Sequence, residues 1–368
     1  MKRVALVGAR GHGASYFDRL DRLTAAGRAR LVAVADPRPP GPLAPRLAGV
    51  TWHDSLKELL AGAEPDVVVL ATPVHTHADL AVAAMRAGCD VLLEKPPAPS
   101  LTEFSRVRAA ATETGRLCQI GFQTFGSEAV EPIRQLIAAG ELGTVTGFGA
   151  VGTWVRTAGY WARSAWAGRR RLDGQDVVDG VVTNPLAHAV ATALLVAGAP
   201  GLDDVAAVET DLYRANDIEA DDTSSGVVTL ADGRRLSFGF TLCAPRRTPA
   251  MVLVHGSRGT LKLAYESDTV EVNGETRTFG RVDLLEDLLT ARETGHRPRC
   301  PVEDTASFMR VVDAVREAKE PAQIEDRHLR WEGEGADRHP IVTDVEAWCW
   351  RAATEGGTFA ALGAPWAR

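Results

Sequence analysis

Short apolar runs alternate with amphipathic segments through the first third of the chain. Runs of this kind are expected of parallel strands buried on both faces, and they fall at Val4–Val7, Leu31–Ala35, Val67–Leu70 and Val91–Leu93. Apolar residues at three-to-four spacing indicate helices over Tyr16–Ala25, Leu56–Leu60, Ala78–Ala87 and Leu101–Thr114. Ser100, with Glu103 three residues on, is a capping-box start for the last of these helices. A further strand in Leu117–Phe122 closes a unit that resembles a six-strand doubly wound parallel sheet, of which these runs locate five strands.

A different pattern follows residue 122. Alternating runs separated by turn sequences are typical of a mostly antiparallel sheet with one open face, and the runs are Thr144–Trp154, Val205–Tyr213, Ser224–Leu230, Arg235–Leu242, Met251–His255, Thr260–Ala264 and Thr269–Val272. Helices are expected near residues 128–139, 282–293, 303–319 and 343–355. The predicted fold class is therefore α/β. A doubly wound domain would span residues 1–122, and an α/β domain with an open sheet and a C-terminal helical tail would span residues 123–368.

Charge and cysteine content narrow the function classes. The chain has 368 residues, with 41 Lys and Arg against 48 Asp and Glu, so its net charge of -7 offers no field that attracts nucleic acid or anionic lipid. Five scattered cysteines without a C-x-x-C pair favour neither a disulfide framework nor a zinc site, and a reducing cytoplasm fits best. The first apolar run is too short for a signal peptide, and no run approaches the roughly 18 apolar residues of a membrane span.

A glycine-rich loop follows the first predicted strand. Between a strand and a helix, such a loop places the pyrophosphate of a dinucleotide on backbone N–H groups at the helix N-terminus. The loop consists of Gly8, Ala9, Arg10, Gly11, His12 and Gly13. Arg10 departs from the G-x-G-x-x-G pattern, which has glycine where the backbone approaches the phosphates. A tight strand-to-helix turn without a nucleotide is the alternative interpretation.

An acidic residue ends the second predicted strand. Asp36 follows Gly13 by 23 residues, close to the roughly 20 at which an acid binds the adenosine ribose hydroxyls. Such an acid favours NAD, whereas Arg38 is suited to the 2′-phosphate of NADP. We therefore predict NAD as the cofactor and leave NADP open. A turn-forming aspartate before Pro37 is the structural alternative.

Two further loops leave the carboxyl ends of predicted parallel strands, where open α/β sheets bind ligands. One follows Val67–Leu70 and ends in His75-Thr76-His77, and the other is Glu94-Lys95-Pro96. The two histidines have no carboxylate or cysteine at ligand spacing, so we predict no metal site. We assign cofactor contacts in these loops to Thr72, Pro73, His77, Glu94 and Lys95.

Taken in order, these motifs resemble one protein family. The succession G-x-x-G-x-G, D-P-R, T-P-x-x-x-H and E-K-P is similar to that of the Gfo/Idh/MocA family, named for glucose-fructose oxidoreductase and inositol dehydrogenase. The resemblance continues through Gly121–Gln123, Ile137–Val145 and Pro301–Ala318. It implies a Rossmann domain followed by an α/β domain whose open sheet can serve as an oligomer interface. It also implies that Lys95 hydrogen-bonds the substrate oxygen and that the proline after it often sits on a cis peptide bond. A lysine on a solvated loop is the alternative.

The second catalytic element of the family is a D-x-x-x-H pair on a helix. Here the matching segment runs from Asn184 to His188, so Asn184 replaces the aspartate of the family. Because positions i and i+4 share a helix face, both side chains can address one ligand. His188 is suited to accepting a hydroxyl proton, and Asn184 can orient a hydroxyl but cannot accept its proton. Three interpretations remain open. The protein could be a working enzyme in which Asn184 gives His188 less electrostatic help than an aspartate would, or it could bind cofactor and ligand without turnover. In the third, His188 is a core residue whose hydrogen bonds are made within the protein.

Aromatic and arginine residues gather ahead of this pair. Three of the eight tryptophans fall within residues 154–166, with arginines between them. Aromatic faces and guanidinium groups suit a sugar ring, a polyol or an acidic group on one, and a stacked cluster at a domain interface is the alternative. We take Tyr160 as a second candidate proton donor. The predicted substrate contacts are Gln123, Tyr160, Trp161, Arg163, Trp166 and His188.

The sequence therefore predicts an NAD(P)-dependent oxidoreductase that transfers hydride between nicotinamide and a secondary alcohol of a sugar, polyol or related hydroxy compound. Two alternatives are a regulatory protein that binds nucleotide and ligand without turnover, and a hydrolase or lyase that retains its NAD. We expect a small-molecule substrate and a homodimer or homotetramer. We expect neither a nucleic acid nor a membrane partner.

Overall fold

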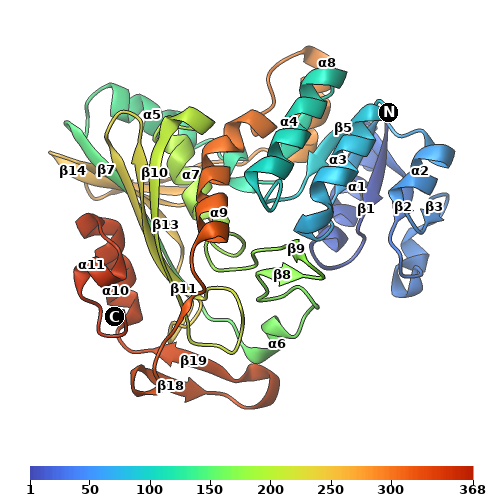
Figure 1. The fold of residues 1–368 in the computed structure, drawn as a ribbon. Helices are drawn as coiled ribbons and strands as arrows, with labels where there is room; N and C mark the ends of the chain where they lie inside the picture. The colour runs from blue at the N-terminus through green and yellow to red at the C-terminus, as the bar shows by residue number, and fades with distance from the viewer. Residues whose placement is uncertain (368) are drawn as a thin grey trace. The chain divides into compact units, whose positions relative to one another are not determined.

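A computed structural model describes residues 1–367, and the chain within it divides into two compact units (Figure 1). Met1–Phe122 and Val282–Glu303 form the first unit. Gln123–Arg281 and residues 304–367 form the second. The predicted second domain included residues 282–303, whereas in the structure they belong to the first unit.

The first unit is built on a six-stranded parallel sheet with the strand order β3-β2-β1-β4-β5-β6. Every residue of β4 and β5 is buried, which explains their nearly unbroken apolar sequences. The predicted doubly wound sheet is confirmed. Only the three-residue β3 was not predicted, because none of its residues is buried. The strands are β1 Lys2–Val7, β2 Ala29–Ala35, β3 Thr51–His53, β4 Val67–Leu70, β5 Asp90–Leu93 and β6 Cys118–Ile120.

Helices cover this sheet and end where the local sequence dictates. Ser100 Oγ accepts a hydrogen bond from Glu103 N at 3.3 Å, as predicted for the N-cap, and Gly115 ends the helix in the left-handed conformation. The buried Gln119 explains why the later segment joins this unit, because its amide donates to Leu284 O and accepts from Cys300 N. The helices are α1 Ser15–Ala25, α2 Leu56–Ala63, α3 His77–Arg86, α4 Leu101–Thr114 and α8 Leu284–Thr294.

The second unit contains a nine-stranded sheet with the order β16-β15-β14-β13-β7-β12-β11-β10-β17. Within residues 1–367, only the β7–β12 and β10–β17 neighbours of this sheet pair in parallel. The predicted mostly antiparallel sheet is confirmed. Its strands are β7 Val145–Thr153, β10 Val205–Arg214, β11 Thr223–Leu230, β12 Arg235–Thr241, β13 Met251–Gly256, β14 Gly259–Ala264, β15 Thr269–Val272, β16 Glu275–Thr278 and β17 Ala322–Gln323.

One face of this sheet packs against α7 (Ala187–Val196). A Cβ atom on Gly152 of β7 would lie 2.5 Å from the Leu186 side chain just before this helix, so the glycine permits the close approach. The other elements of the unit are α5 Val130–Ala138, α6 Ala158–Trp161, α9 Ala306–Glu317, and the hairpins β8–β9 (Arg171–Leu172, Gln175–Asp176) and β18–β19 (Leu329–Glu332, His339–Val342).

The C-terminal segment covers the opposite face of the same sheet. It contains α10 (Val345–Arg351) and α11 (Phe359–Leu362), which lie beside the strands in Figure 1. A Cβ atom on Gly239 would lie 2.4 Å from Cys349 O, and one on Gly149 would lie 2.5 Å from Ala353 O. The predicted sheet was open on one face, whereas in the structure the C-terminal helices cover this part of the face, and Gly149 and Gly239 leave room for their backbone.

Within the described residues, no helix is both long and apolar enough to cross a membrane. No group of three or more His, Cys, Asp or Glu side chains in residues 1–367 is arranged to hold a metal ion. The five cysteines are free and buried.

Candidate active site

The glycine-rich loop joins β1 to α1 through the 3-10 helix η1 (Gly11–Ala14). Gly8 has a φ of +83°, and a Cβ atom on it would lie 2.4 Å from Ala71 O. A Cβ atom on Gly13 would lie 1.9 Å from Gly8 O, so both glycines are needed for the loop to pack. A Cβ atom on Gly11 would meet no described atom within 4 Å, which leaves open space at the middle of the loop.

Among the described residues, no side chain caps the N-terminus of α1. Neither Arg10 before η1 nor Ala14 before α1 makes a capping hydrogen bond through its side chain, whereas Ser55 and Ser100 cap α2 and α4. An uncapped helix N-terminus suits an anionic group, because the exposed N–H groups and the helix dipole both favour negative charge. Together with the open space at Gly11, this end of α1 fits the pyrophosphate of a dinucleotide.

Arg10 does not fill that space, because its side chain is held at the end of β2. Its Nη1 lies 2.7 Å from Asp36 Oδ1, and its Nη2 donates to Pro39 O. The departure from the G-x-G-x-x-G pattern therefore adds a cation to the ribose side of the loop.

Asp36 lies at the carboxyl end of β2 and is buried. Its Oδ1 also accepts from Arg38 N at 3.0 Å and Arg38 Nε at 3.3 Å, and its Oδ2 accepts from Ala9 N at 3.2 Å. Burial acts to raise the pKa of Asp36, but the hydrogen bonds from Arg38 and Ala9 and the charge of Arg10 lower the pKa below its usual value. Asp36 is therefore an ionised carboxylate between two guanidinium groups.

Glu94 ties the E-K-P loop to the glycine-rich loop. Its buried Oε1 accepts from Tyr16 Oη at 2.5 Å and lies 3.0 Å from His12 Nε2. Burial acts to raise the pKa of Glu94, but the hydrogen bond and charge of His12, with the Tyr16 hydroxyl, lower the pKa to about 2. A Cβ atom on Gly121 would lie 2.8 Å from Glu94 Oε2, so glycine leaves room for this carboxylate.

Lys95 lies directly after Glu94 on a loop that a buried histidine holds. The Lys95–Pro96 bond is cis, the configuration that the resemblance implied. The ring of His77 is 1% exposed, with Nδ1 at 2.8 Å from Pro96 O and Nε2 at 2.8 Å from Thr72 O. Burial lowers the pKa of His77, although both carbonyl groups act to raise it. The geometry supports a positioning role for His77, which joins the loops after β4 and β5.

A buried carboxylate that the sequence analysis did not single out organises the loop before α7. Asp179 accepts from Asn184 Nδ2 at 2.5 Å, from Arg163 Nη2 at 2.9 Å and from Gly168 N at 2.8 Å. Asn184 lies in a turn, because α7 begins only at Ala187. The expected helix face shared with His188 is therefore absent, and contact with Asp179 orients the Asn184 amide instead. Asp179 had no sequence signal, since its partners lie on irregular segments.

His188 lies in the first turn of α7 beside a tyrosine that was also not predicted. Its ring centroid is 6.4 Å from that of Tyr265, which follows β14. The Tyr265 hydroxyl and the Gln123 amide nitrogen are both buried without a hydrogen-bond partner in residues 1–367. Burial raises the pKa of Tyr265, so its hydroxyl remains a neutral donor. Both groups are candidates for contact with a ligand.

Arginine side chains stack on the rings of the predicted aromatic cluster. The Arg163 guanidinium carbon lies 3.7 Å from the centroid of Tyr160 and 4.7 Å from that of Trp166, and the Arg156 carbon lies 4.8 Å from Tyr160. Tyr160 and Trp161 meet edge to face at 4.9 Å. Burial raises the pKa of Tyr160. This arrangement favours the stacked cluster over an open sugar platform, and substrate contacts by these residues stay a prediction.

Two family models match the chain. The model described as an oxidoreductase family with an NAD-binding Rossmann fold matches residues 2–122, and the Gfo/Idh/MocA C-terminal domain matches residues 130–262. The chain belongs to the Gfo/Idh/MocA family. Residues 2–122 of its first unit are the NAD-binding Rossmann domain of that family, which accounts for the glycine loop and the uncapped end of α1.

The names of similar proteins include both NAD(+) and NADP(+) as cofactors. The chain is 32% identical over 130 residues to scyllo-inositol 2-dehydrogenase (NAD(+)) of Bacillus subtilis (strain 168), which covers 35% of this chain and 38% of that protein. It is 29% identical over 306 residues to D-xylose 1-dehydrogenase (NADP(+)) 2 of Haloferax volcanii, which covers 79% of this chain and 87% of that protein. The chain spans about two fifths of the length of several inositol dehydrogenases that it matches.

Solved structures share the fold. The WlbA dehydrogenase from Bordetella pertussis, crystallised with NADH and UDP-GlcNAcA, has a TM-score of 0.71 at 21% identity. The match covers 85% of this chain and 94% of that chain. At this identity the likeness concerns the fold alone.

Proposed function

We propose that the protein is an NAD(P)-dependent dehydrogenase that transfers hydride between nicotinamide and a secondary alcohol of a sugar, polyol or related hydroxy compound. The observation that carries this proposal is the Glu94 carboxylate, which is hydrogen-bonded to the glycine-rich loop and α1 and holds Lys95 directly after it. The names of relatives that act on inositol and D-xylose support an alcohol substrate.

The cofactor supplies the hydride chemistry, and this chain's residues bind it. Gly8–Gly13 and the N-terminus of α1 would hold the pyrophosphate, and Asp36 with Arg10 and Arg38 would hold the adenosine ribose. Thr72 and Pro73 on the loop after β4 complete the proposed contacts. The two guanidinium groups at Asp36 support acceptance of NADP as well as NAD.

Three polar side chains would act on the substrate. The Lys95 ammonium stabilises negative charge that develops on the substrate oxygen, and His188 accepts the hydroxyl proton in the oxidative direction. Asn184 Nδ2 donates to Asp179, which directs the Asn184 carbonyl oxygen away from that carboxylate. We propose that this oxygen orients the substrate hydroxyl, with Gln123 as a further contact.

Lys95→Ala tests the proposal. Once a panel that includes inositols and aldoses has identified a substrate, turnover should fall by about 100- to 1,000-fold, the loss expected when one stabilising donor is removed. NADH affinity, followed by fluorescence, should change less than threefold, because the glycine-rich loop is untouched. Lys57→Ala, an exposed lysine in α2, is the matched control and should keep full activity.

The outcomes separate the alternatives. Unchanged turnover in Lys95→Ala would remove the catalytic assignment. NADH binding without conversion of any compound would favour a regulatory protein. Conversion without net change in nicotinamide absorbance would favour a hydrolase or lyase that retains its NAD.

Assembly and location stay predictions. We propose a homodimer or homotetramer in the cytoplasm, where a reducing environment suits five buried free thiols. Light scattering on the purified chain measures the assembly directly.

A further inference from the structure

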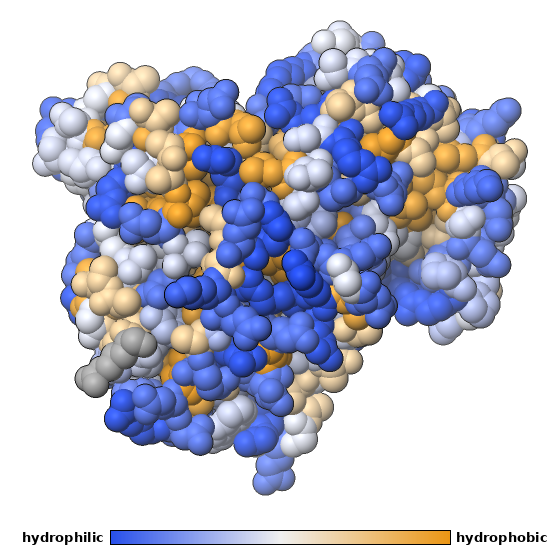
Figure 2. Space-filling view, in the orientation of Figure 1, coloured by the Kyte–Doolittle hydropathy of each residue, from blue (hydrophilic) through white to orange (hydrophobic). Residues whose placement is uncertain are grey.

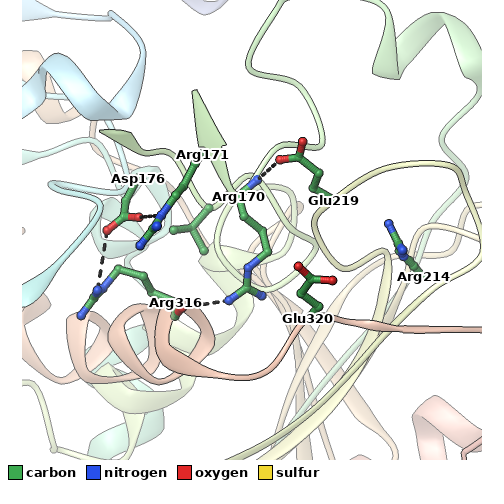
Figure 3. Close-up of a pocket in the computed structure, with 8 residues that line it drawn as sticks. Arg170, Arg171, Asp176, Arg214, Glu219, Arg316 and Glu320 are labelled. Carbon is green, nitrogen blue, oxygen red and sulfur yellow. Dashed lines mark hydrogen bonds and ion pairs between the residues drawn. The ribbon is translucent and has the colours of Figure 1, made fainter. Parts of the chain in front are cut away.

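A pocket of about 300 Å³ lies within the second unit, among residues for which the proposed dehydrogenase reaction has no use. Four arginines and three acidic residues line it, so its formal charge is +1. They come from the β8–β9 hairpin, the end of β10 with the turn after it, and the end of α9 (Figure 3). Figure 2 shows strongly hydrophilic surface over α9 and this hairpin.

Two of the four arginines are neutralised by neighbouring carboxylates. Arg171 Nε lies 2.9 Å from Asp176 Oδ1, and Arg316 Nη1 lies 3.6 Å from Asp176 Oδ2. Arg316 also pairs with Asp313 at 2.8 Å. These ion pairs form one wall of the pocket and need no further anion.

The other two arginines, Arg170 and Arg214, form no ion pair in the part of the chain that the structure describes. Arg170 Nη2 donates to the carbonyl oxygens of Val315, Arg316 and Ala318 at the C-terminal end of α9. Arg214 Nη1 donates to Ile218 O. Arg170 Nη1 and Arg214 Nε are buried without a hydrogen-bond partner in residues 1–367.

The two remaining carboxylates do not satisfy these groups. Glu219 accepts from the Arg169 side chain and from Arg170 N, so its oxygens serve a neighbouring arginine and the backbone. Glu320 is exposed, and no dashed line joins it to the other residues in Figure 3. A buried N–H donor without a partner is unfavourable, because it loses hydration without compensation. The charge of Arg170 does act on the buried Asp221, whose pKa it lowers against the larger effect of burial.

We infer that this pocket binds a small organic oxyanion, a phosphoryl or carboxylate group carried on a small molecule. Guanidinium groups bind both chemistries through paired N–H donors, and Arg170 and Arg214, which line the pocket without an ion pair among the described residues, would supply them. The volume of about 300 Å³ leaves room for the rest of the molecule beyond the oxyanion.

Calorimetric titration of the full-length protein with inorganic phosphate and, separately, with malonate tests the inference at constant ionic strength set with chloride. Arg214→Gln should weaken binding at least tenfold, and Arg214→Lys should fall between Arg214→Gln and wild type because it keeps the charge but loses the paired N–H donors of the guanidinium. Arg330→Gln is the matched control. Arg330 is an exposed arginine of the same unit that pairs with Glu332 and does not line the pocket, so the variant should bind as wild type does. The phosphate and malonate arms distinguish a phosphoryl ligand from a carboxylate ligand.

Glu320→Gln keeps the test decisive if Arg214→Gln does not fold. Removing this exposed carboxylate raises the positive charge of the pocket, so the affinity should rise at least threefold. Absence of heat with both anions, or equal binding by wild type, Arg214→Gln and Glu320→Gln, would overturn the inference. Because no nicotinamide is present, the result is independent of the proposed dehydrogenase function.

Discussion

At the scale of single residues, Arg10 has the clearest effect on the nucleotide site. A dinucleotide-binding acid usually offers its oxygens to the ribose hydroxyls. Here both oxygens of Asp36 are already hydrogen-bonded, and the Arg10 and Arg38 guanidinium groups lie 2.7 and 3.3 Å from one of them. Two cations against one anion leave a positive charge where the 2′-phosphate of NADP would be placed.

We therefore predict that Arg10→Ala weakens NADPH binding at least tenfold more than NADH binding. A tenfold ratio corresponds to about 1.4 kcal/mol, an ordinary value for a lost charge-assisted contact. Fluorescence titration with both nucleotides measures it. Arg38→Ala is the comparison, since its side chain is 65% exposed and its contact is longer, so a smaller effect is expected. Equal weakening of both nucleotides would instead mean that Arg10 supports the shape of the glycine loop.

Part of the site could be predicted because its residues lie in short motifs that are contiguous in the sequence. The glycines, Asp36 and the E-K-P loop lie in strand-to-helix connections whose geometry follows from their position in the sheet. Asp179 and Tyr265 could not be found in this way. Turns separate Asp179 from Arg163 and Asn184, and the strands β10 to β14 separate Tyr265 from His188. No spacing rule relates such positions.

At the scale of elements, the C-terminal segment is the largest departure from expectation. Its helices were partly visible as an amphipathic pattern near 343–355, but their docking was not. Docking depends on Gly149 and Gly239, whose missing side chains admit the backbone of the segment. Buried hydrogen bonds reinforce it, as when Phe359 N donates to Ser225 Oγ at 2.7 Å.

Gly239→Ala should displace this segment and destabilise the protein. The new methyl group would lie 2.4 Å from Cys349 O, so backbone must move, and overpacking of this kind costs about 1–3 kcal/mol. Urea unfolding, with limited proteolysis of the C-terminal segment, measures the effect. Gly62→Ala in α2 is the control, because its methyl group would lie 3.6 Å from the nearest atom and alanine favours a helix. Equal stability of both variants would contradict the proposed packing of the C-terminal segment against Gly239.

At the scale of the whole molecule, topology was more predictable than packing between distant segments. The parallel and antiparallel sheets follow from apolar periodicity, which reports burial on two faces or one. Gln119 holds residues 282–303 in the first unit, because its side-chain amide hydrogen-bonds the backbone of Leu284 and Cys300. A single buried amide leaves no periodic trace, so contacts of this kind escape a reading of the sequence.

Glu94 connects the site to the pH dependence of global stability. Its pKa falls from an ordinary value of 4.5 to about 2 in the folded protein, so its ionisation contributes about 3 kcal/mol of stability above the unfolded pKa. That contribution is present above about pH 4.5 and is lost as the pH falls towards about 2. Between about pH 6 and pH 3.5, the free energy of unfolding of the wild type should therefore fall by about 1–1.5 kcal/mol more than that of Glu94→Gln. Urea unfolding of both proteins at the two pH values measures the difference, and parallel curves would mean that Glu94 is not held as an ionised carboxylate by His12 and Tyr16.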